Sequence, residues 1–293
     1  MKNLIVSLYI IFFIASSVYC QNLKDTNQEN PGNINLIFAE NSFHNIKTED
    51  ASATAQILAN HIKNLKNLKN NFIVKLAKND KEILEMCKDD FDLVLLTTEQ
   101  YLRLKKQLPL EPFSTNFTDG SYGFVYHLIV NKSDGINDIR QLKGETIYIQ
   151  AHTKDQAATL FLNKLLKDAS QKSVENFFKD IVVDSKATNV LLPVFFKKAK
   201  ACLITNSSLK LLMELNPSIK NQIKILYSTN PIILGLTCLN ANKKNDEAYK
   251  IFKEVLPILH ENEYGKQFLN LFGTEKLILF KEEYLKGYYN LTK

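Results

Sequence analysis

Short apolar segments alternate with amphipathic ones along most of the chain, and this alternation restricts the possible folds more than any other feature. Residues 34–38 form an apolar run, and residues 49–68 place apolar side chains at helical spacing. Residues 92–96 are so apolar that we expect both faces of that strand to be covered. Strands that alternate with helices favour an α/β fold with mostly parallel sheets. Further strands are expected at 72–76, 122–131, 146–150, 181–183, 201–205, 223–227 and 232–239, and further helices at 80–88, 153–166, 187–198, 209–214, 246–259 and 265–272.

The N-terminus has the features of a secretory signal peptide. Lys2 precedes an apolar run from Leu4 to Val18, and polar residues follow from Gln21. Such a run is too short to cross a bilayer comfortably, so we expect residues 1–20 to be removed and the mature protein to be periplasmic or extracellular. An uncleaved anchor is the alternative. Lipidation at Cys20 is not favoured, because Tyr19 is bulky where that signal needs a small residue.

The net charge of +6 comes from lysines scattered along the chain, and the only arginines are Arg103 and Arg140. Nucleic-acid binding requires a clustered basic face, which this pattern does not provide. Scattered lysines are typical of a solvated surface, and they bias the electrostatic field toward anionic solutes.

Motifs of the common enzyme classes are absent from the sequence. The five histidines are dispersed, there is no H-E-x-x-H or G-x-S-x-G motif, and nine glycines leave little material for a nucleotide-binding loop. We therefore expect a binding protein and not an enzyme, with no metal and no cofactor. Cys87, Cys202 and Cys238 lack metal-ligand spacing. A disulfide between Cys202 and Cys238 and a pair of buried thiols both stay open.

Four segments carry a resemblance to a known family. They are residues 92–96 with the helix start after them, residues 122–132 leading into 135–147, residues 194–202, and residues 226–231. In this order and spacing they resemble the phosphate/phosphonate-binding (PhnD-like) family of periplasmic solute-binding proteins of ABC transporters.

The resemblance implies the two-lobed type II periplasmic binding protein fold, in which each lobe is a mostly parallel sheet flanked by helices. Lobe one would comprise residues 31–121 and 240–293, and lobe two residues 130–228. Strands at 122–131 and 230–239 would cross between them. The protein would be a monomer that delivers a small anionic solute to membrane permease subunits. A ligand-sensing protein that signals to a membrane partner is the alternative, followed by a transferase on the same fold.

A ligand would lie where the strands end, because α/β sheets place their binding crevices there. Free N–H groups at helix starts attract anions. The resemblance and this geometry together predict a set of ligand-binding residues. Within it, Thr153 has an equal claim to be a plain helix cap, and Tyr122 lies in a crossing strand, where an aromatic residue is more often part of the core. The set is Ser42, Thr97, Thr98, Tyr122, His152, Thr153, Lys154, Ser185, Thr205 and Asn206.

The sequence departs from members of this family that bind aminophosphonates. Leu95 and Leu96 stand where those members have aromatic residues, Lys186 stands where an acid is expected, and Lys200 replaces an Asp. Burial of a ligand ammonium without a carboxylate is costly. We therefore expect phosphate-like, phosphite-like or other small anions, and not 2-aminoethylphosphonate.

Overall fold

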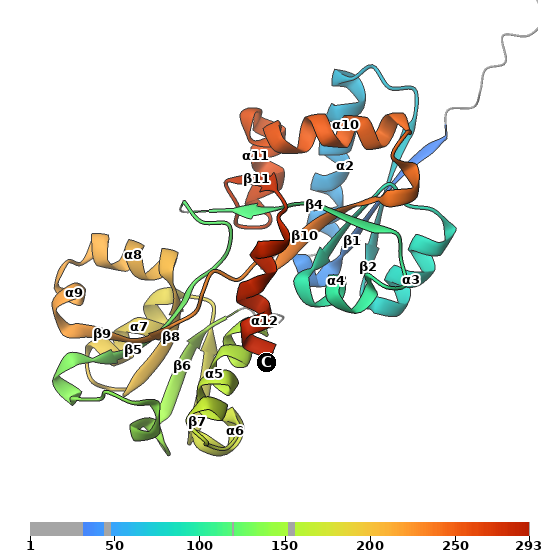
Figure 1. Cartoon of the computed structure of the whole chain (residues 1–293). Coiled ribbons are helices and arrows are strands. Elements are labelled where there is room, and N and C mark those ends of the chain that lie inside the picture. Colours follow the sequence, from blue (N-terminus) through green and yellow to red (C-terminus); the bar gives the residue numbers. More distant parts are fainter. Residues whose placement is uncertain (1–31, 44–47, 119, 152–155, 293) are drawn as a thin grey trace, which may run out of the picture.

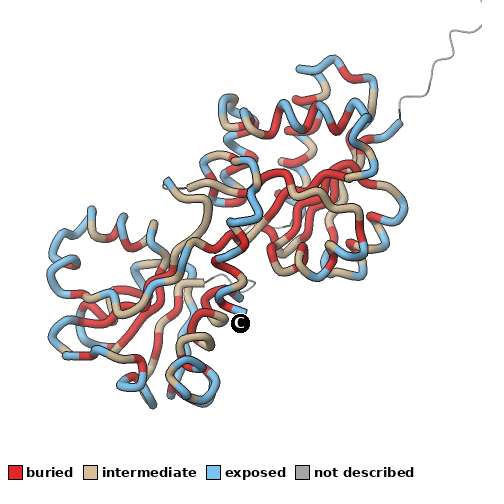
Figure 2. Tube along the Cα trace, viewed as in Figure 1, coloured by how far each residue is buried: buried red, intermediate tan, exposed pale blue. Residues whose placement is uncertain are grey.

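The computed structural model describes residues 32–43, 48–118, 120–151 and 156–292, which form two lobes (Figure 1). Each lobe has one sheet with helices on both faces, and buried residues follow both sheets (Figure 2). The predicted signal peptide, residues 1–20, lies outside the described residues. In the part of the chain that the structure describes, no helix combines the length and hydropathy needed to span a membrane.

Lobe one contains a six-stranded sheet in the order β11-β4-β10-β3-β1-β2. Strand β1 is parallel to β2 and β3, whereas β10 is antiparallel to both β3 and β4, and β11 is antiparallel to β4. The strands are β1 (Asn33–Ala39), β2 (Asn71–Ala77), β3 (Leu93–Thr97), β4 (Leu110–Phe117), β10 (Gly235–Asn240) and β11 (Lys276–Leu279).

Side chains alternate along the strands of lobe one, so each face of the sheet has its own core. Leu93 and Leu95 belong to the core beneath α2 (Thr48–Leu65), α10 (Glu247–Val255) and α11 (Glu263–Asn270). Val94 and Leu96 belong to the opposite core. That core is covered by α3 (Asp80–Asp89) and α4 (Thr98–Leu104), and the short helices η1 (Glu40–Ser42), η4 (Ala241–Lys243) and η5 (Leu256–Glu261) connect elements of the lobe.

Lobe two contains a five-stranded sheet in the order β7-β6-β8-β5-β9, in which β6 is parallel to β7 and β8, and β5 is antiparallel to β8 and β9. The strands are β5 (Tyr126–Asn131), β6 (Thr146–Gln150), β7 (Asp180–Asp184), β8 (Ala201–Thr205) and β9 (Ile223–Ser228). The helices are η2 (Lys132–Asp134), η3 (Ile139–Leu142), α5 (Ala157–Asp168), α6 (Val174–Phe177), α7 (Ala187–Phe195), α8 (Asn206–Leu215) and α9 (Ser218–Gln222).

The two-lobed α/β fold is confirmed, but the sheets are mixed where mostly parallel sheets were expected. Two strands, β4 and β11, were missed. Strand β4 contains Pro112, and a proline argues against a strand in sequence because it has no backbone N–H to donate to the ladder. The register shifts where Pro112 faces β10, leaving Phe113 as an extra residue in β4. Proline is tolerated at such a bulge because the ladder is already interrupted there.

Two segments, residues 120–125 and 229–234, lie between the sheets. They meet in a pair of hydrogen bonds in which Phe124 N donates to Ile232 O and Ile232 N donates to Phe124 O, both at 2.9 Å. The backbones approach so closely that a Cβ atom on Gly123 would lie 2.6 Å from Ile232 O. The crossing segments are shorter than the strands predicted at 122–131 and 230–239. The later residues of each predicted strand belong to the sheets instead, in β5 and in β10.

The C-terminal helix α12 (Lys286–Thr292), which follows η6 (Glu282–Leu285), lies between the lobes (Figure 1). Tyr288 and Leu291 belong to a core of lobe two, and Tyr289 packs against a core of lobe one. A Cβ atom on Gly287 would lie 1.9 Å from Pro231 O in the second crossing segment. Helix α12 thus falls within the range assigned to lobe one but contacts both lobes. The lobe boundaries stay a prediction.

Of the two alternatives left open for Cys202 and Cys238, the structure supports buried thiols and not a disulfide. Cys202 lies in β8 and Cys238 in β10, so the two residues belong to different sheets. Both are buried free thiols, as is Cys87. Burial raises the pKa of the Cys87 thiol to about 12, so it stays protonated at neutral pH.

Gly287→Ala tests whether close backbone contact holds α12 in place. Alanine normally stabilises a helix relative to glycine by about 1 kcal/mol. Here the added methyl group meets Pro231 O, so we expect a net loss of about 1–3 kcal/mol in the free energy of unfolding. Lys286→Ala, at an exposed position in the same helix, is the control and should change stability by less than about 0.5 kcal/mol. Urea denaturation of both variants measures this, and a Gly287→Ala variant as stable as wild type would contradict the packing argument.

Candidate functional site

Two cavities lie where the lobes face each other. The main cavity has a volume of about 260 Å³ and is lined by the strand ends of lobe one together with Gln156, Ala157 and Tyr288 of α5 and α12. The adjoining cavity, of about 180 Å³, is lined mostly by residues of lobe two. Leu234 of the second crossing segment and Phe272 line both cavities, so the two form adjacent parts of one interlobe site.

The start of α4 forms one wall of the main cavity. Thr97 caps this helix, because its Oγ1 accepts a hydrogen bond from Gln100 N (3.2 Å) while Gln100 Oε1 accepts one from Thr97 N (3.1 Å). Thr98 is almost fully buried, and its hydroxyl donates to Ile233 O at 2.6 Å. Thr98 therefore attaches the strand end to the second crossing segment, and its hydroxyl proton is not free to bond a ligand.

Ser42 lies at the end of the short helix η1 that follows β1, and it lines the main cavity. Its side chain is 8% exposed, and its Oγ has no hydrogen-bond partner among the described residues. A buried hydroxyl without a partner costs free energy, so native proteins rarely leave one unsatisfied. Ser42 is therefore a cavity-wall residue with an unsatisfied hydroxyl, and its Oγ, which has almost no accessible surface here, would have to rotate about χ1 to meet a ligand.

The charged residues of the main cavity are paired with each other. Among the described residues that line it, Glu99 and Arg103 carry charge, and they form an ion pair. Arg103 also donates to both carboxylate oxygens of Asp80, at 2.6 and 3.1 Å. The hydrogen bond from Arg103 lowers the pKa of Asp80. The guanidinium is consequently held by two carboxylates and does not present an uncompensated positive charge.

Gln150 organises the lobe-two wall of the adjoining cavity. Its Oε1 accepts hydrogen bonds from Thr205 N and Thr205 Oγ1, at 3.1 and 3.2 Å, and its Nε2 donates to Ser208 Oγ at 2.7 Å. Thr205 caps α8, since its Oγ1 accepts from Ser208 N. The end of β6 is thereby joined to the first turn of α8, and Ser207 and Ser208 of that turn line the cavity.

Asn206, the first residue of α8, lines a small third cavity of about 30 Å³ with Asn116. His127 on β5 is buried and bridges Asn206 Oδ1 (3.1 Å) and Ser228 Oγ (2.7 Å). Because an amide oxygen only accepts hydrogen bonds, His127 Nε2 carries a proton. The bridge joins α8 to β5 and β9 and leaves the Asn206 amide nitrogen for other contacts.

The family model for the periplasmic phosphonate-binding proteins of ABC transporters matches residues 46–284. This range includes the crossing segments and most of both lobes, and it leaves out β1 and α12. The chain belongs to this family.

Solved structures with the same fold include members of this family at low sequence identity. PhnD1 from Prochlorococcus marinus in complex with methylphosphonate is 14% identical over 89% of this chain and 97% of its own, with a TM-score of 0.55. A binding protein of an ABC phosphonate transporter from Pseudomonas aeruginosa is 15% identical over 90% and 86%, with a TM-score of 0.53. A Xanthomonas citri protein bound to ATP is 13% identical over 89% and 96%, with a TM-score of 0.58. No curated protein matches the chain in sequence.

Half of the ligand-binding residues predicted from the sequence lie in the walls of the three cavities. Ser42, Thr97 and Thr98 line the main cavity, Thr205 the adjoining one, and Asn206 the third. Their roles as ligand contacts stay a prediction. They share a position at the carboxyl end of a strand or at the turn after it, as the fold requires.

The other predicted site residues lie elsewhere or outside the described residues. The Tyr122 ring stacks on that of Tyr284, with centroids 4.1 Å apart, and packs against a core of lobe one. Ser185 follows β7, and its carbonyl oxygen accepts a hydrogen bond from Gln150. Neither residue lines any of the three cavities. His152, Thr153 and Lys154 lie outside the described residues.

Sequence reasoning missed several polar residues in the cavity walls. Gln150 is the last residue of a predicted strand, and Ser207 and Ser208 directly follow another, so the rule that selected Thr205 would also have found them. Asn116 was missed because β4 was not predicted. Phe272 comes from a distant segment that no local pattern places here. Among the residues that the structure describes, no cluster of His, Cys, Asp or Glu is suited to hold a metal ion.

The Asp80–Arg103 pair gives the stability of the cavity wall a specific pH dependence. Because the pKa of Asp80 is lowered in the folded state, the pair contributes stability above the ordinary carboxyl pKa of 3.8, and this contribution is lost as the pH falls through the lowered value. Asp80→Asn should therefore reduce the free energy of unfolding at pH 7 by up to about 1 kcal/mol. The difference from wild type should shrink below about pH 4.

Urea titrations at pH 7 and pH 3 measure this difference. Glu85→Gln is the control, because Glu85 lies on the same helix in an exposed ion pair at 3.9 Å, and it should have little effect at either pH. An Asp80→Asn deficit that stays constant from pH 7 to pH 3 would show that the carboxylate charge does not act through Arg103.

Proposed function

We propose that this chain is the extracytoplasmic solute-binding component of an ABC importer and captures a small phosphorus oxyanion, or a similar anion, between its lobes. Its family membership supports the binding role, and the methylphosphonate complex of PhnD1 supports the ligand class. The single observation that carries the proposal within this chain is the Ser42 hydroxyl, which is buried in the main cavity wall without a partner.

The cavity walls suit an anion held by neutral donors. The first turn of α8, a ten-residue helix, lies at the adjoining cavity, and the dipole at a helix start attracts anionic oxygen. Two N–H groups of this turn are already bonded, Asn206 N to Val125 O and Ser208 N to Thr205 Oγ1, so the dipole and the remaining donors would act on the anion. Ser207 and Ser208 add hydroxyls at that turn, and Ser42 adds one from lobe one. An oxyanion between these groups would accept hydrogen bonds from both lobes, which is the condition for a ligand to hold the lobes together.

The paired charges of the main cavity disfavour a cationic substituent. Glu99 is the acidic residue among the described lining residues, and its carboxylate is bonded to Arg103. A ligand ammonium would have to displace Arg103 or remain unpaired, and the latter is costly in a buried site. We therefore expect the protein to bind 2-aminoethylphosphonate more weakly than phosphite, phosphate and simple alkylphosphonates.

Residues 152–155 belong to this proposal as an additional anion contact. The flanking residues support it, since Ala151 lines the adjoining cavity and Gln156 the main cavity. Thr153 would add a hydroxyl there, Lys154 would add a positive charge, and His152 would add an imidazole N–H donor. The protein would act by binding alone, in the periplasm after removal of residues 1–20, and would pass the solute to permease subunits.

Ser42→Ala and Ser114→Ala form a matched pair that tests the site. Both serines are buried in lobe one with an unpartnered Oγ, but Ser114 does not line the main cavity. Removal of an unsatisfied hydroxyl should leave the stability of the ligand-free protein unchanged or slightly higher in both variants. Only Ser42→Ala should weaken oxyanion binding, by about tenfold, because one hydrogen bond to a charged ligand is lost.

A thermal-shift screen of the mature protein against phosphate, phosphite, methylphosphonate, methanesulfonate and 2-aminoethylphosphonate selects the probe, and calorimetric titration measures its affinity for each variant. Equal affinity of Ser42→Ala and wild type would remove Ser42 from the site. If none of the five anions bound, the proposed ligand class would be wrong.

A further inference from the structure

Behind the main cavity, on the side away from lobe two, lies a smaller apolar cavity of about 40 Å³, here called the chamber. All of its lining residues are apolar except Asn116 and Thr237. The chamber and the main cavity have Leu95, Asn116 and Phe272 in common, so these three residues form the partition between them. A void of this kind is unusual in a core, since protein interiors are close-packed.

The alternation of strand side chains explains why a polar site and an apolar void adjoin. Thr97, Leu95 and Leu93 lie on the same face of β3 because they are two residues apart. Thr97 lines the main cavity, Leu95 lines both cavities, and Leu93 lines the chamber. One face of a single strand thus passes from polar to apolar with increasing depth below the strand end.

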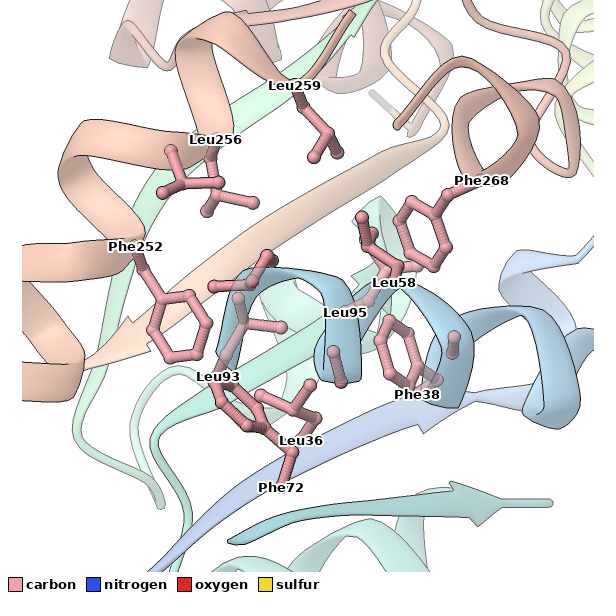
Figure 3. Close-up of a cluster of buried hydrophobic side chains, with 14 of the residues drawn as sticks. Leu36, Phe38, Leu58, Phe72, Leu93, Leu95, Phe252, Leu256, Leu259 and Phe268 are labelled. Carbon is pink, nitrogen blue, oxygen red and sulfur yellow. The ribbon is translucent and has the colours of Figure 1, made fainter. Parts of the chain in front are cut away.

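Aromatic rings surround the boundary between the two cavities. Phe272 stacks on Phe43 with centroids 5.1 Å apart and meets Phe268 edge-on at 5.1 Å, and Phe268 contacts Phe38 at 5.9 Å. Figure 3 shows Leu58 of α2 facing Phe38 and Phe268. Phe38, Leu58, Phe268 and Phe272 line the chamber, and no charged group is among its described lining residues. A charged ligand atom would be excluded here, whereas a hydrocarbon group would be stabilised.

We infer that the chamber receives the carbon substituent of the bound oxyanion, so that this chain takes a ligand with an oxyanionic head and a short, uncharged alkyl chain. The inference rests on the proposed function, because the head must lie in the main cavity beside Ser42 for the tail to reach the partition. The alkyl chain would pass between Leu95 and Phe272 and run along the face of β3 toward Leu93.

The volume of the chamber limits the length of the tail. A water-sized group needs about 10–15 Å³ of such space, so 40 Å³ accommodates about three methylene-sized groups. Each methylene transferred from water to an apolar site raises affinity by about fourfold. The affinity of alkyl oxyanions should therefore rise steeply from methyl to propyl or butyl and then stop rising or fall.

Calorimetric titration of the mature protein with methyl-, ethyl-, propyl-, butyl- and hexylphosphonate, and with the matching alkylsulfonates, measures this dependence. The parallel series separates phosphonate from sulfonate as the preferred head, since the tail effect should appear in whichever series binds. Ala55→Leu fills the chamber, because Ala55 is a buried lining residue on α2. It should abolish the gain with chain length while leaving the affinity for the methyl compound within about twofold of wild type.

Leu58→Ala is a second variant, which enlarges the chamber where Ala55→Leu fills it. It tests whether the chamber holds the alkyl tail even if Ala55→Leu does not fold. Leu58 lines the chamber, so its truncation should move the optimum to a longer chain. Leu65→Ala is the matched control, because Leu65 is an exposed leucine on the same helix and should leave the optimum unchanged.

The outcomes distinguish this inference from the proposed function. If the oxyanions bind with the same affinity whatever their tail, or if the chain-length gain persists in Ala55→Leu and its optimum stays fixed in Leu58→Ala, the chamber does not hold the tail, while the proposed function stands. If no compound of either series binds, the proposed function fails and this inference fails with it.

Discussion

The interlobe site depends on backbone contact among three segments that lie between the lobes. The two crossing segments are hydrogen-bonded to each other at Phe124 and Ile232, and α12 packs against the second segment at Gly287. Gly123 and Gly287 permit these contacts because any side chain there would collide with a carbonyl oxygen. Leu234, in the second crossing segment, lines both large cavities. The position of these three contacting segments therefore determines how the cavity walls face each other.

The interlobe site has polar residues at the ends of its strands and apolar residues deeper within the same strands. Capping explains the polar side: Thr97 and Thr205 each end a strand and begin a helix, so their side chains satisfy helix N–H groups at the cavity wall. Packing explains the apolar side, where Leu95 and Phe272 separate the main cavity from the chamber. Because the lining residues Glu99 and Arg103 pair with each other, they add hydrogen-bonding groups to the wall without adding net charge. The proposed ligand, a small oxyanion with an uncharged substituent, would match both sides.

Local sequence rules predicted the parts of this structure that depend on local forces. Apolar periodicity located most strands and helices, and the rule that ligands lie at strand ends placed Ser42, Thr97 and Thr205 in cavity walls. The failures have long-range causes. Strand β4 is held by pairing with β10 and β11, which are distant in sequence, so Pro112 could not be recognised as a bulge residue. Because β4 was not predicted, Asn116 was not recognised as a residue of the cavity wall. Tyr122 found a stacking partner in Tyr284, more than 160 residues away, and no pattern near Tyr122 indicates that contact.

The central claim is that the ligand lies between the lobes and draws them together about the crossing segments. Small-angle X-ray scattering of the mature protein, with and without a saturating oxyanion identified by thermal shift, tests it most directly. The account predicts a smaller radius of gyration with ligand, because hydrogen bonds from both lobes to one anion favour the closed arrangement. An unchanged scattering profile, recorded at a ligand concentration that calorimetry shows to be saturating, would contradict it.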